Sequence, residues 1–354
     1  MSATAPSIVE RARADIRALT PYSHAAWEPS LQRMHANELP WRVAGDASAA
    51  GLNRYPEPQP PQLVDGLARL YGVSPGEVLV GRGSDEAIDL LMRVFCRAGQ
   101  DNVIVCPPTF GMYAVAARIQ GAEVRAVPLL VQQGFAIDEA ALLARVDDNT
   151  KLVCLCSPNN PTANALPPAQ LLRIARALAP RALLVVDEAY IDFAPVESLC
   201  PRLAGTPNLA ILKTLSKAHG LAGARVGALL AAPEIIALAR KVIPPYAITE
   251  LTVEAVTPLL APAAIEAMRA RVAALLAERE RLAAALARSP LVSRVWPSDA
   301  NFLLVDCADC DAVLAHVRRA GLIIRDVRQP ALPRSLRISV GTPQQNDRLL
   351  ESLA

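Results

Sequence analysis

Short runs of Val, Ile and Leu alternate with helix-like segments through the middle of the chain, and this alternation limits the possible folds more than any other feature. Such runs occupy positions 78–80, 103–105, 152–156, 183–186, 209–212 and 226–230. Strands that alternate with helices are typical of a mostly parallel sheet with helices on both faces. Right-handed crossovers bring the carboxyl ends of such strands to one edge, where open α/β sheets bind ligands. We therefore predict an α/β fold with a ligand site at that edge.

The regions on either side of this pattern differ from it. Residues 1–48 combine a short helical pattern with irregular, proline-containing sequence, which is typical of an arm that packs against something else. A long pattern rich in Ala, Leu and Arg begins at 263, and further strand and helix patterns follow it. We therefore expect an N-terminal arm over 1–48, a large domain over 49–262 and a small α+β domain over 263–354.

Composition narrows the possible functions. The chain has 354 residues, of which 52% are hydrophobic, and this is enough to build two cores. The formal charge of +2, without a basic run, argues against nucleic acid and membrane surfaces and favours a small-molecule ligand. Positions 1–17 lack a continuous apolar stretch, and the seven cysteines lie mostly in apolar runs. We therefore expect a protein of the reducing cytoplasm, without a signal peptide or membrane span.

A polar segment follows the apolar run at 209–212. It contains Lys217, flanked by the hydroxyl groups of Thr214 and Ser216 and followed by Arg225. An amine can form a Schiff base with a carbonyl group, and an arginine beside hydroxyl groups can bind a phosphate. The segment therefore suits a phosphorylated aldehyde. A solvated loop lysine is the alternative interpretation of Lys217.

The three other lysines are weaker candidates. Lys151 opens a strand and Lys241 follows an apolar helical patch, and a lysine at either position normally keeps its charge in water. Lys213 occupies the last residues of the strand before the polar segment. This leaves Lys217 as the candidate for amine chemistry.

Two further candidates follow earlier strands of the predicted sheet. Ser84 comes after a strand and a Gly81-Arg82-Gly83 turn, where a serine at the N-cap of a helix leaves backbone N–H groups to bind an anion. Ordinary capping is the alternative. Phe110 follows the next strand, where its ring can stack on a flat cofactor or belong to the core.

Polar residues also end the two central strands. Asn160, held before a proline, presents a neutral amide. Asp187 ends a buried strand, where a carboxylate requires a cation such as a protonated ring nitrogen, or else caps the next turn. Cys307 and Cys310 lack the further ligands that zinc needs, so no metal site is predicted. We expect His219 to line the site without acting as a base.

Together these motifs resemble a known family. Asn160-Pro161-Thr162, then Asp187-Glu188-Ala189-Tyr190, then Ser216-Lys217 with Arg225 resemble the fold-type I aminotransferases, which use pyridoxal 5'-phosphate. The segments 19–22, 36–38, 81–86, 108–113 and 336–342 are similar, more narrowly, to those of histidinol-phosphate aminotransferases. The resemblance covers nearly the whole chain. It implies reversible transamination between histidinol phosphate and 2-oxoglutarate, giving imidazole acetol phosphate and glutamate, in histidine biosynthesis.

The resemblance also implies roles around the cofactor. Lys217 would bind it covalently and carry the transferred proton, while Asp187 would pair with the ring nitrogen. Asn160 and Tyr190 would bind the phenolic oxygen, and Phe110 would stack on the ring. The residues implied at the cofactor phosphate are Ser84 and Asp85 through backbone amides, Ser216 and Arg225, and Thr214 belongs to the same cofactor-binding set.

Further roles concern the substrate and a second chain. Tyr22, Arg325 and Arg337 resemble the residues that receive the substrate phosphate, and Arg337 also suits the carboxylate of glutamate. Asn37 belongs to the substrate-binding set. Tyr55 resembles a tyrosine that family members contribute to the phosphate site of the partner subunit, which implies a homodimer. We expect the arm to pack on the small domain and on this partner.

The sequence departs from the family pattern at a few positions, and other functions compete. The departures are Ala163 in place of glycine, Phe110 in place of tyrosine, His219 in place of an aromatic residue, and His35 in place of aspartate or asparagine. The competing functions are an aromatic amino-acid aminotransferase, a decarboxylase of a phosphorylated amino acid such as threonine phosphate, and a non-catalytic regulator that binds pyridoxal phosphate.

Overall fold

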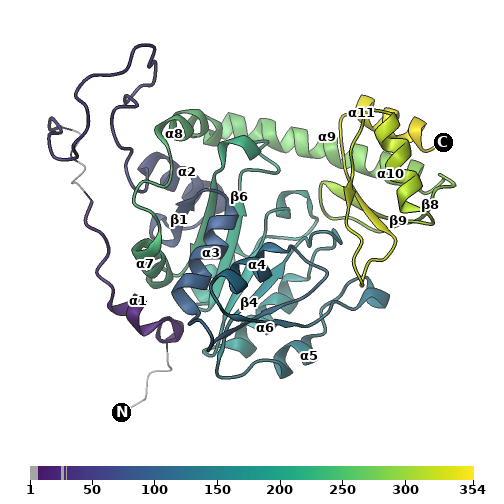
Figure 1. Cartoon of the computed structure of the whole chain (residues 1–354), viewed down its shortest axis with the longest axis horizontal. Coiled ribbons are helices and arrows are strands. Elements are labelled where there is room, and N and C mark those ends of the chain that lie inside the picture. Colours follow the sequence, from purple (N-terminus) through teal and green to yellow (C-terminus); the bar gives the residue numbers. More distant parts are fainter. Residues whose placement is uncertain (1–6, 25–27, 29) are drawn as a thin grey trace.

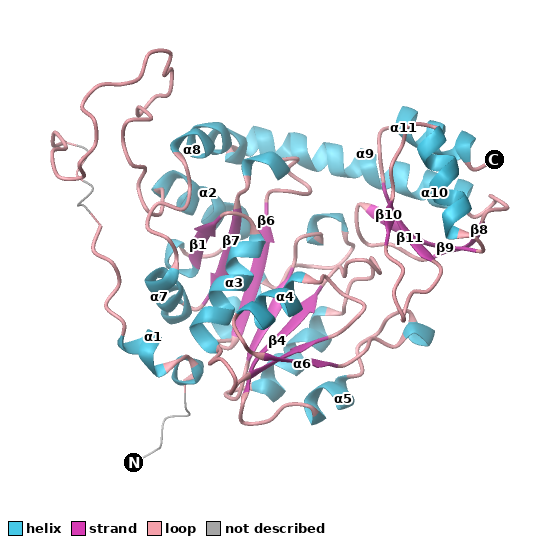
Figure 2. Ribbon diagram, in the orientation of Figure 1, coloured by secondary structure: helices cyan, strands magenta, loops and turns pink. Residues whose placement is uncertain are grey.

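The large domain contains a seven-stranded sheet with the order β1-β7-β6-β5-β4-β2-β3 (Figure 2). The computed structural model describes residues 7–24, 28 and 30–354, so parts of the N-terminal arm lie outside the described residues. Strands β2 to β6 run parallel, and β7 runs antiparallel to both β6 and β1. The strands are β1 (Val78–Gly81), β2 (Asn102–Val105), β3 (Glu123–Ala126), β4 (Thr150–Cys156), β5 (Leu183–Asp187), β6 (Leu209–Thr214) and β7 (Gly227–Ala231).

Helices cover both faces of this sheet, as the alternation predicts. On one face lie α3 (Ser84–Phe95), α4 (Met112–Ile119) and α7 (Pro233–Val242). On the other lie α2 (Pro61–Tyr71), α5 (Glu139–Ala144), α6 (Pro168–Leu178) and α8 (Glu250–Val256). Along β4, Leu152 and Cys154 pack into the first layer, whereas Val153 and Leu155 pack into the second. The central strands are therefore buried on both faces, which explains their continuous apolar sequence.

The small domain begins where the long helix α9 (Pro262–Leu286) leaves the large domain (Figure 2). Its antiparallel sheet has the order β10-β11-β9-β8. The elements are β8 (Val292–Val295), β9 (Phe302–Cys307), α10 (Cys310–Arg319), β10 (Arg325–Asp326), β11 (Ser335–Ser339) and α11 (Pro343–Ser352). The strand-like run at 322–325 yields only the two-residue β10, and this places Arg325 opposite Arg337 of β11.

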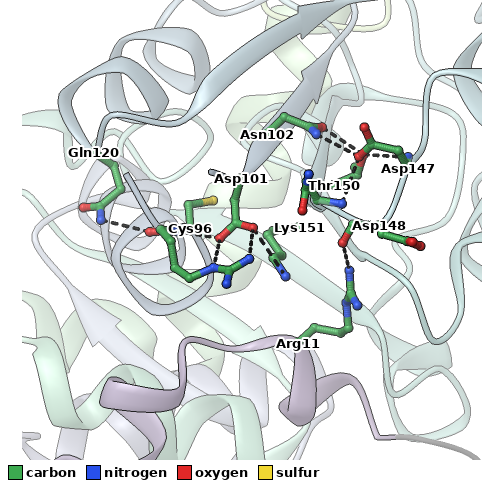
Figure 3. A network of polar contacts seen from close by, with 11 residues as sticks. Arg11, Cys96, Asp101, Asn102, Gln120, Asp147, Asp148, Thr150 and Lys151 are labelled. Atoms are coloured by element: carbon green, nitrogen blue, oxygen red, sulfur yellow. Dashed lines mark hydrogen bonds and ion pairs between the residues drawn. The ribbon is translucent and has the colours of Figure 1, made fainter. Parts of the chain in front are cut away.

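The N-terminal segment is anchored at the end of the large sheet where β4 begins (Figure 3). A short 3-10 helix (Ile8–Arg11) buries Ile8, and Arg11 donates a hydrogen bond to the backbone oxygen of Asp148. Nearby, Lys151 is only 7% exposed and its Nζ lies 3.5 Å from an oxygen of Asp101. The expectation that Lys151 remains in water is therefore wrong, because a buried carboxylate lies beside it.

After α1 (Ala14–Ala18) the arm runs past α7 and α8, at the opposite end of the molecule from α10 and α11 (Figure 1). Ala49, directly after the arm, donates its N–H to Glu254 of α8 at 2.5 Å, and Lys241 Nζ of α7 donates to the backbone oxygen of Arg17 in the arm at 2.6 Å. This placement differs from the expected packing of the arm on the small domain.

Among the described residues, no helix combines the length and apolar character needed to cross a membrane.

A close backbone contact at the start of β7 generates a testable prediction. A Cβ atom on Gly227 would lie 2.5 Å from the carbonyl carbon of Gly83 and from the nitrogen of Ser84. We expect Gly227→Ala to lower the free energy of unfolding by about 1–3 kcal/mol, since backbone atoms must move apart. Gly223→Ala is the control, because a Cβ atom there would meet no other atom within 4 Å. Equal unfolding free energies for the two variants in urea denaturation would contradict this prediction.

Candidate active site

A cavity of about 820 Å³ lies at the carboxyl edge of the parallel strands, between the large and small domains. Its walls come from the loops after β1, β2, β4, β5 and β6, and from the segment at 325–329 and β11 of the small domain. The predicted residues that line it are Ser84, Asp85, Phe110, Asn160, Asp187, Tyr190, Thr214, Ser216, Lys217, Arg225, Arg325 and Arg337. Parallel strands thus bring together residues that lie far apart in the sequence.

Asp187 ends β5 at the floor of the cavity and is 2% exposed. Its Oδ2 accepts a hydrogen bond from the hydroxyl group of Tyr113 at 2.7 Å, and its Oδ1 accepts one from the N–H of Ala189 at 3.0 Å. Burial raises the pKa of Asp187 to about 6, although these two hydrogen bonds act in the opposite direction. The carboxylate is therefore ionised at neutral pH and strongly attracts a cation.

Lys217 lies in the turn that follows β6. The hydroxyl group of Thr214 accepts a hydrogen bond from the N–H of Ser216 at 3.1 Å, which shapes the turn. Lys217 Nζ lies 5.5 Å from the centre of the Tyr190 ring. Burial lowers the pKa of Lys217, and the charge of Arg337 acts in the same direction. A lowered pKa increases the fraction of neutral amine, which is the form that attacks a carbonyl group.

The first turn of α3 and Arg225 form a corner of the cavity whose groups suit an anion. Arg225 Nη1 donates to Ser216 Oγ at 3.3 Å, and its Nη2 donates to Asp85 Oδ2 at 3.3 Å. Gly83, with φ of +83°, occupies the N-cap, and Ser84 is the first helical residue. The predicted N-cap at Ser84 is therefore wrong by one residue, because only glycine readily adopts this backbone conformation. The free N–H groups of the first turn still face the corner.

Side chains from the two domains meet on another wall of the cavity. Asn160 Nδ2 donates to the hydroxyl group of Tyr190 at 3.3 Å, and Arg337 of β11 donates to Asn160 Oδ1. Burial lowers the pKa of Arg337, and the charge of Arg325 acts in the same direction. Two neighbouring guanidinium groups repel each other unless an anion lies between them. This wall therefore suits a substrate with a phosphate or carboxylate group.

Three predicted site residues, all in the N-terminal part of the chain, do not line this cavity: Tyr22, Asn37 and Tyr55. The ring of Tyr55 stacks on the ring of Tyr246 at 4.6 Å, and both Tyr22 and Tyr55 are exposed. Asn37 adopts a left-handed backbone conformation with φ of +57°. Their assigned roles therefore stay predictions, because these residues do not reach the cavity of their own chain.

Two residues near the site differ from what the sequence led us to expect. Tyr113, to which we assigned no role, is completely buried. Its ring and that of Phe110 form a T-shaped pair with centres 5.6 Å apart, and its hydroxyl group binds Asp187, so it links these two predicted site residues. Its position three residues after Phe110, in the first turn of α4, was the available signal. His219, which we expected to line the site, does not line the cavity, and burial lowers its pKa.

Comparisons with known proteins identify the family. The chain matches the model of the family described as "Aminotransferase class I and II" over residues 31–353. The chain belongs to this family. The fold-type I architecture predicted from the sequence is therefore confirmed, including the small antiparallel domain.

Relatives of the chain carry consistent descriptions. It is 46% identical to histidinol-phosphate aminotransferase of Stenotrophomonas maltophilia, over 100% of this chain and 98% of the relative. Identity with the Xylella fastidiosa protein of the same description is 45%, with the same coverage. The histidinol-phosphate aminotransferase of Sinorhizobium meliloti, solved with pyridoxal-5'-phosphate, gives a TM-score of 0.77 at 28% identity, covering 85% of this chain and 82% of that one.

A decarboxylase is also structurally similar. The L-threonine-O-3-phosphate decarboxylase of Porphyromonas gingivalis gives a TM-score of 0.71 at 25% identity, covering 85% of this chain and 92% of that one. Fold alone therefore does not separate transamination from decarboxylation.

The Tyr113–Asp187 hydrogen bond generates a pH-dependent prediction for the cofactor-free protein. The pKa of Asp187 is raised from 3.8 to about 6, so the folded chain binds more protons than the unfolded chain between these values. Stability from this group therefore falls as pH rises through that window. Tyr113→Phe removes a hydrogen-bond donor to the carboxylate of Asp187, so the stability contributed by this group continues to fall above pH 6.

We expect Tyr113→Phe to lose about 1.5–3 kcal/mol of unfolding free energy at pH 7, where the carboxylate is ionised, and clearly less at pH 5. Urea denaturation of the native protein and the variant at both pH values measures the difference. Equal losses at the two pH values would show that Tyr113 contributes packing only.

Proposed function

We propose that this aminotransferase transfers an amino group reversibly between histidinol phosphate and 2-oxoglutarate, as a step of histidine biosynthesis, and that it uses pyridoxal 5'-phosphate. The observation that carries the proposal is one cavity containing Lys217, the buried Asp187 and an anion-binding corner. Relatives described as histidinol-phosphate aminotransferases match the chain over its full length, which supports the choice of substrate.

The residues of the cavity fit this cofactor. Asp187 is ionised at neutral pH and can hold a proton on the ring nitrogen, and Phe110 can cover the ring. Asn160 and Tyr190 form a hydrogen-bonded pair that can bind the phenolic oxygen. The corner of Ser84, Asp85, Thr214, Ser216 and Arg225 provides backbone N–H groups, hydroxyl groups and a guanidinium for the phosphate. When bound, pyridoxal phosphate supplies a conjugated ring that accepts electrons from the substrate.

The chain itself supplies positioning and proton transfer. Lys217 would hold the cofactor through its amine, and the neutral form of this amine would remove the proton from the substrate carbon that bears the amino group. The lowered pKa of Lys217 favours this neutral form. Arg337 binds the carboxylate of glutamate or 2-oxoglutarate, and together with Arg325 it receives the phosphate of histidinol phosphate.

A homodimer completes the site in this proposal. The arm exposes large apolar side chains that a folded monomer would leave in water, namely Leu31, Met34, Leu39, Trp41 and Val43. Exposed apolar side chains that lie so near one another in the sequence are typical of an interface, and Tyr22 lies in the arm and Tyr55 shortly after it. We place Tyr55 in the cofactor phosphate site of the partner subunit and Tyr22 near the substrate phosphate.

Seven free, buried cysteines favour a reducing compartment such as the cytoplasm.

A substrate panel tests the proposed reaction. Purified protein is assayed with histidinol phosphate, phenylalanine and threonine phosphate, each with and without 2-oxoglutarate. We expect turnover of histidinol phosphate that depends completely on the keto acid, because the two anionic groups fit the paired arginines. Faster turnover of phenylalanine would instead favour an aromatic aminotransferase. Carbon dioxide release from threonine phosphate without a keto acid would favour the decarboxylase.

Mixing inactive variants tests the dimer. Lys217→Ala removes the reactive amine and Tyr55→Ala removes the side chain assigned to the partner's site, so each variant alone should be nearly inactive. A hybrid dimer contains one site with native Lys217 and with native Tyr55 from the other chain. After unfolding and refolding as an equal mixture, we expect about a quarter of the native activity. If Tyr55 served its own chain, the mixture would stay inactive.

A further inference from the structure

A buried ion pair lies behind the floor of the cavity. Lys213 Nζ lies 2.6 Å from Glu188 Oε2, and the two side chains are 6% and 2% exposed. Glu188 directly follows Asp187, and Lys213 directly precedes Thr214. Asp187 and Thr214 line the cavity, whereas Glu188 and Lys213 do not. Because successive side chains of a strand point to opposite faces, the pair lies on the reverse side of the sheet from the two cavity residues.

Further contacts complete this pair. Glu188 Oε1 accepts the N–H of Leu199 at 2.7 Å, and Oε2 accepts the hydroxyl group of Ser198. Lys213 Nζ also lies 3.1 Å from Ser198 Oγ and 5.1 Å from the centre of the Tyr71 ring. Burial lowers the pKa of Lys213, but the charge and hydrogen bond of Glu188, together with the charges of Cys200 and Asp192, outweigh burial, and the pKa is raised. Lys213 therefore stays charged and bound to its partner.

The pair joins the two strands that carry the proposed chemistry. Residues of β5 and β6 stay in register up to Asp187 and Leu212, and the N–H of Glu188 bonds the oxygen of Leu212 at 3.0 Å. Beyond this point β5 ends, and β6 continues to Thr214 beside β7. Buried ion pairs are often no more stabilising than apolar side chains of the same volume, so stability alone does not explain this one. The pair instead bridges the ends of the two strands.

We infer that Glu188 and Lys213 are positioning residues, which hold Asp187 and the turn of Lys217 at the separation that the reaction requires. They act through their neighbours and do not contact the reacting atoms. The inference rests on the proposed function, since it concerns the same cavity. A displacement of about 1 Å at a reacting group can reduce the rate about a hundredfold.

A second buried lysine provides a matched control. Lys151 lies at the start of β4, beside the carboxylate of Asp101 (Figure 3). The cavity lies at the other end of the strands. Like Lys213 it is a buried strand lysine close to a carboxylate. Replacing either lysine by methionine removes a buried ammonium group. Only the replacement at 213 should disturb the reaction.

The experiment compares Lys213→Met, Glu188→Gln/Lys213→Met and Lys151→Met with the native protein. For both variants at the pair we expect kcat with histidinol phosphate to fall about tenfold or more, while KM changes about twofold or less. The dissociation constant of pyridoxal phosphate, titrated into the cofactor-free protein, should rise about tenfold. Lys151→Met should keep kcat and cofactor affinity within about twofold of native, even with a lower melting temperature.

The outcomes separate a positioning role from a structural one. Native kcat and cofactor affinity in a folded variant of the pair would overturn the inference, and so would equal losses in Lys151→Met. If the variants at the pair do not fold, Ser198→Ala is used. Ser198→Ala removes the hydroxyl group shared by Glu188 and Lys213 and keeps both charges, so kcat should fall about threefold. The variant Lys213→Arg should retain partial activity. Native kcat in Ser198→Ala together with an inactive Lys213→Arg would also overturn it.

The same measurements keep this inference distinct from the proposed substrate. A native protein that binds pyridoxal phosphate but does not turn over histidinol phosphate refutes the substrate. The comparison of cofactor affinities then still decides the role of the ion pair.

Discussion

The site depends on a carboxylate buried at the end of a central strand. Removing Asp187 from water raises its pKa to about 6, and two hydrogen-bond donors hold it ionised without neutralising it. Among the residues that the structure describes, no ammonium or guanidinium group forms an ion pair with it. Its unbalanced charge therefore favours a cationic ligand at this position, such as a protonated pyridine ring.

The parallel sheet makes this arrangement possible. Strands β2, β4, β5 and β6 end at one edge, so that Phe110, Asn160, Asp187 and Lys217 lie around one cavity although they span more than a hundred positions. The small domain forms another wall of the cavity, where Arg337 donates a hydrogen bond to Asn160. In the function proposed above, one domain thus provides the chemistry at the cofactor, and the other contributes the cations for the substrate's anionic groups.

Much of this could be predicted from the sequence, because strand-end residues follow from the apolar periodicity. Local backbone geometry could not: the left-handed φ of Gly83 moves the helix start to Ser84, and Ala163 adopts φ of +65° where the family pattern has glycine. The edge strand β3 has no apolar run, since its residues are partly exposed. Lys151 and Tyr113 find their partners through tertiary contacts far along the chain, which periodicity does not encode.

One amine, Lys217, holds the cofactor opposite Asp187 in the mechanism proposed above. Borohydride reduction of the yellow holoprotein, followed by proteolysis and mass spectrometry, tests this assignment most directly. We expect a single reduced pyridoxyl-phosphate adduct, located on Lys217. An adduct on Lys213, Lys151 or Lys241, or no adduct on any lysine, would contradict it.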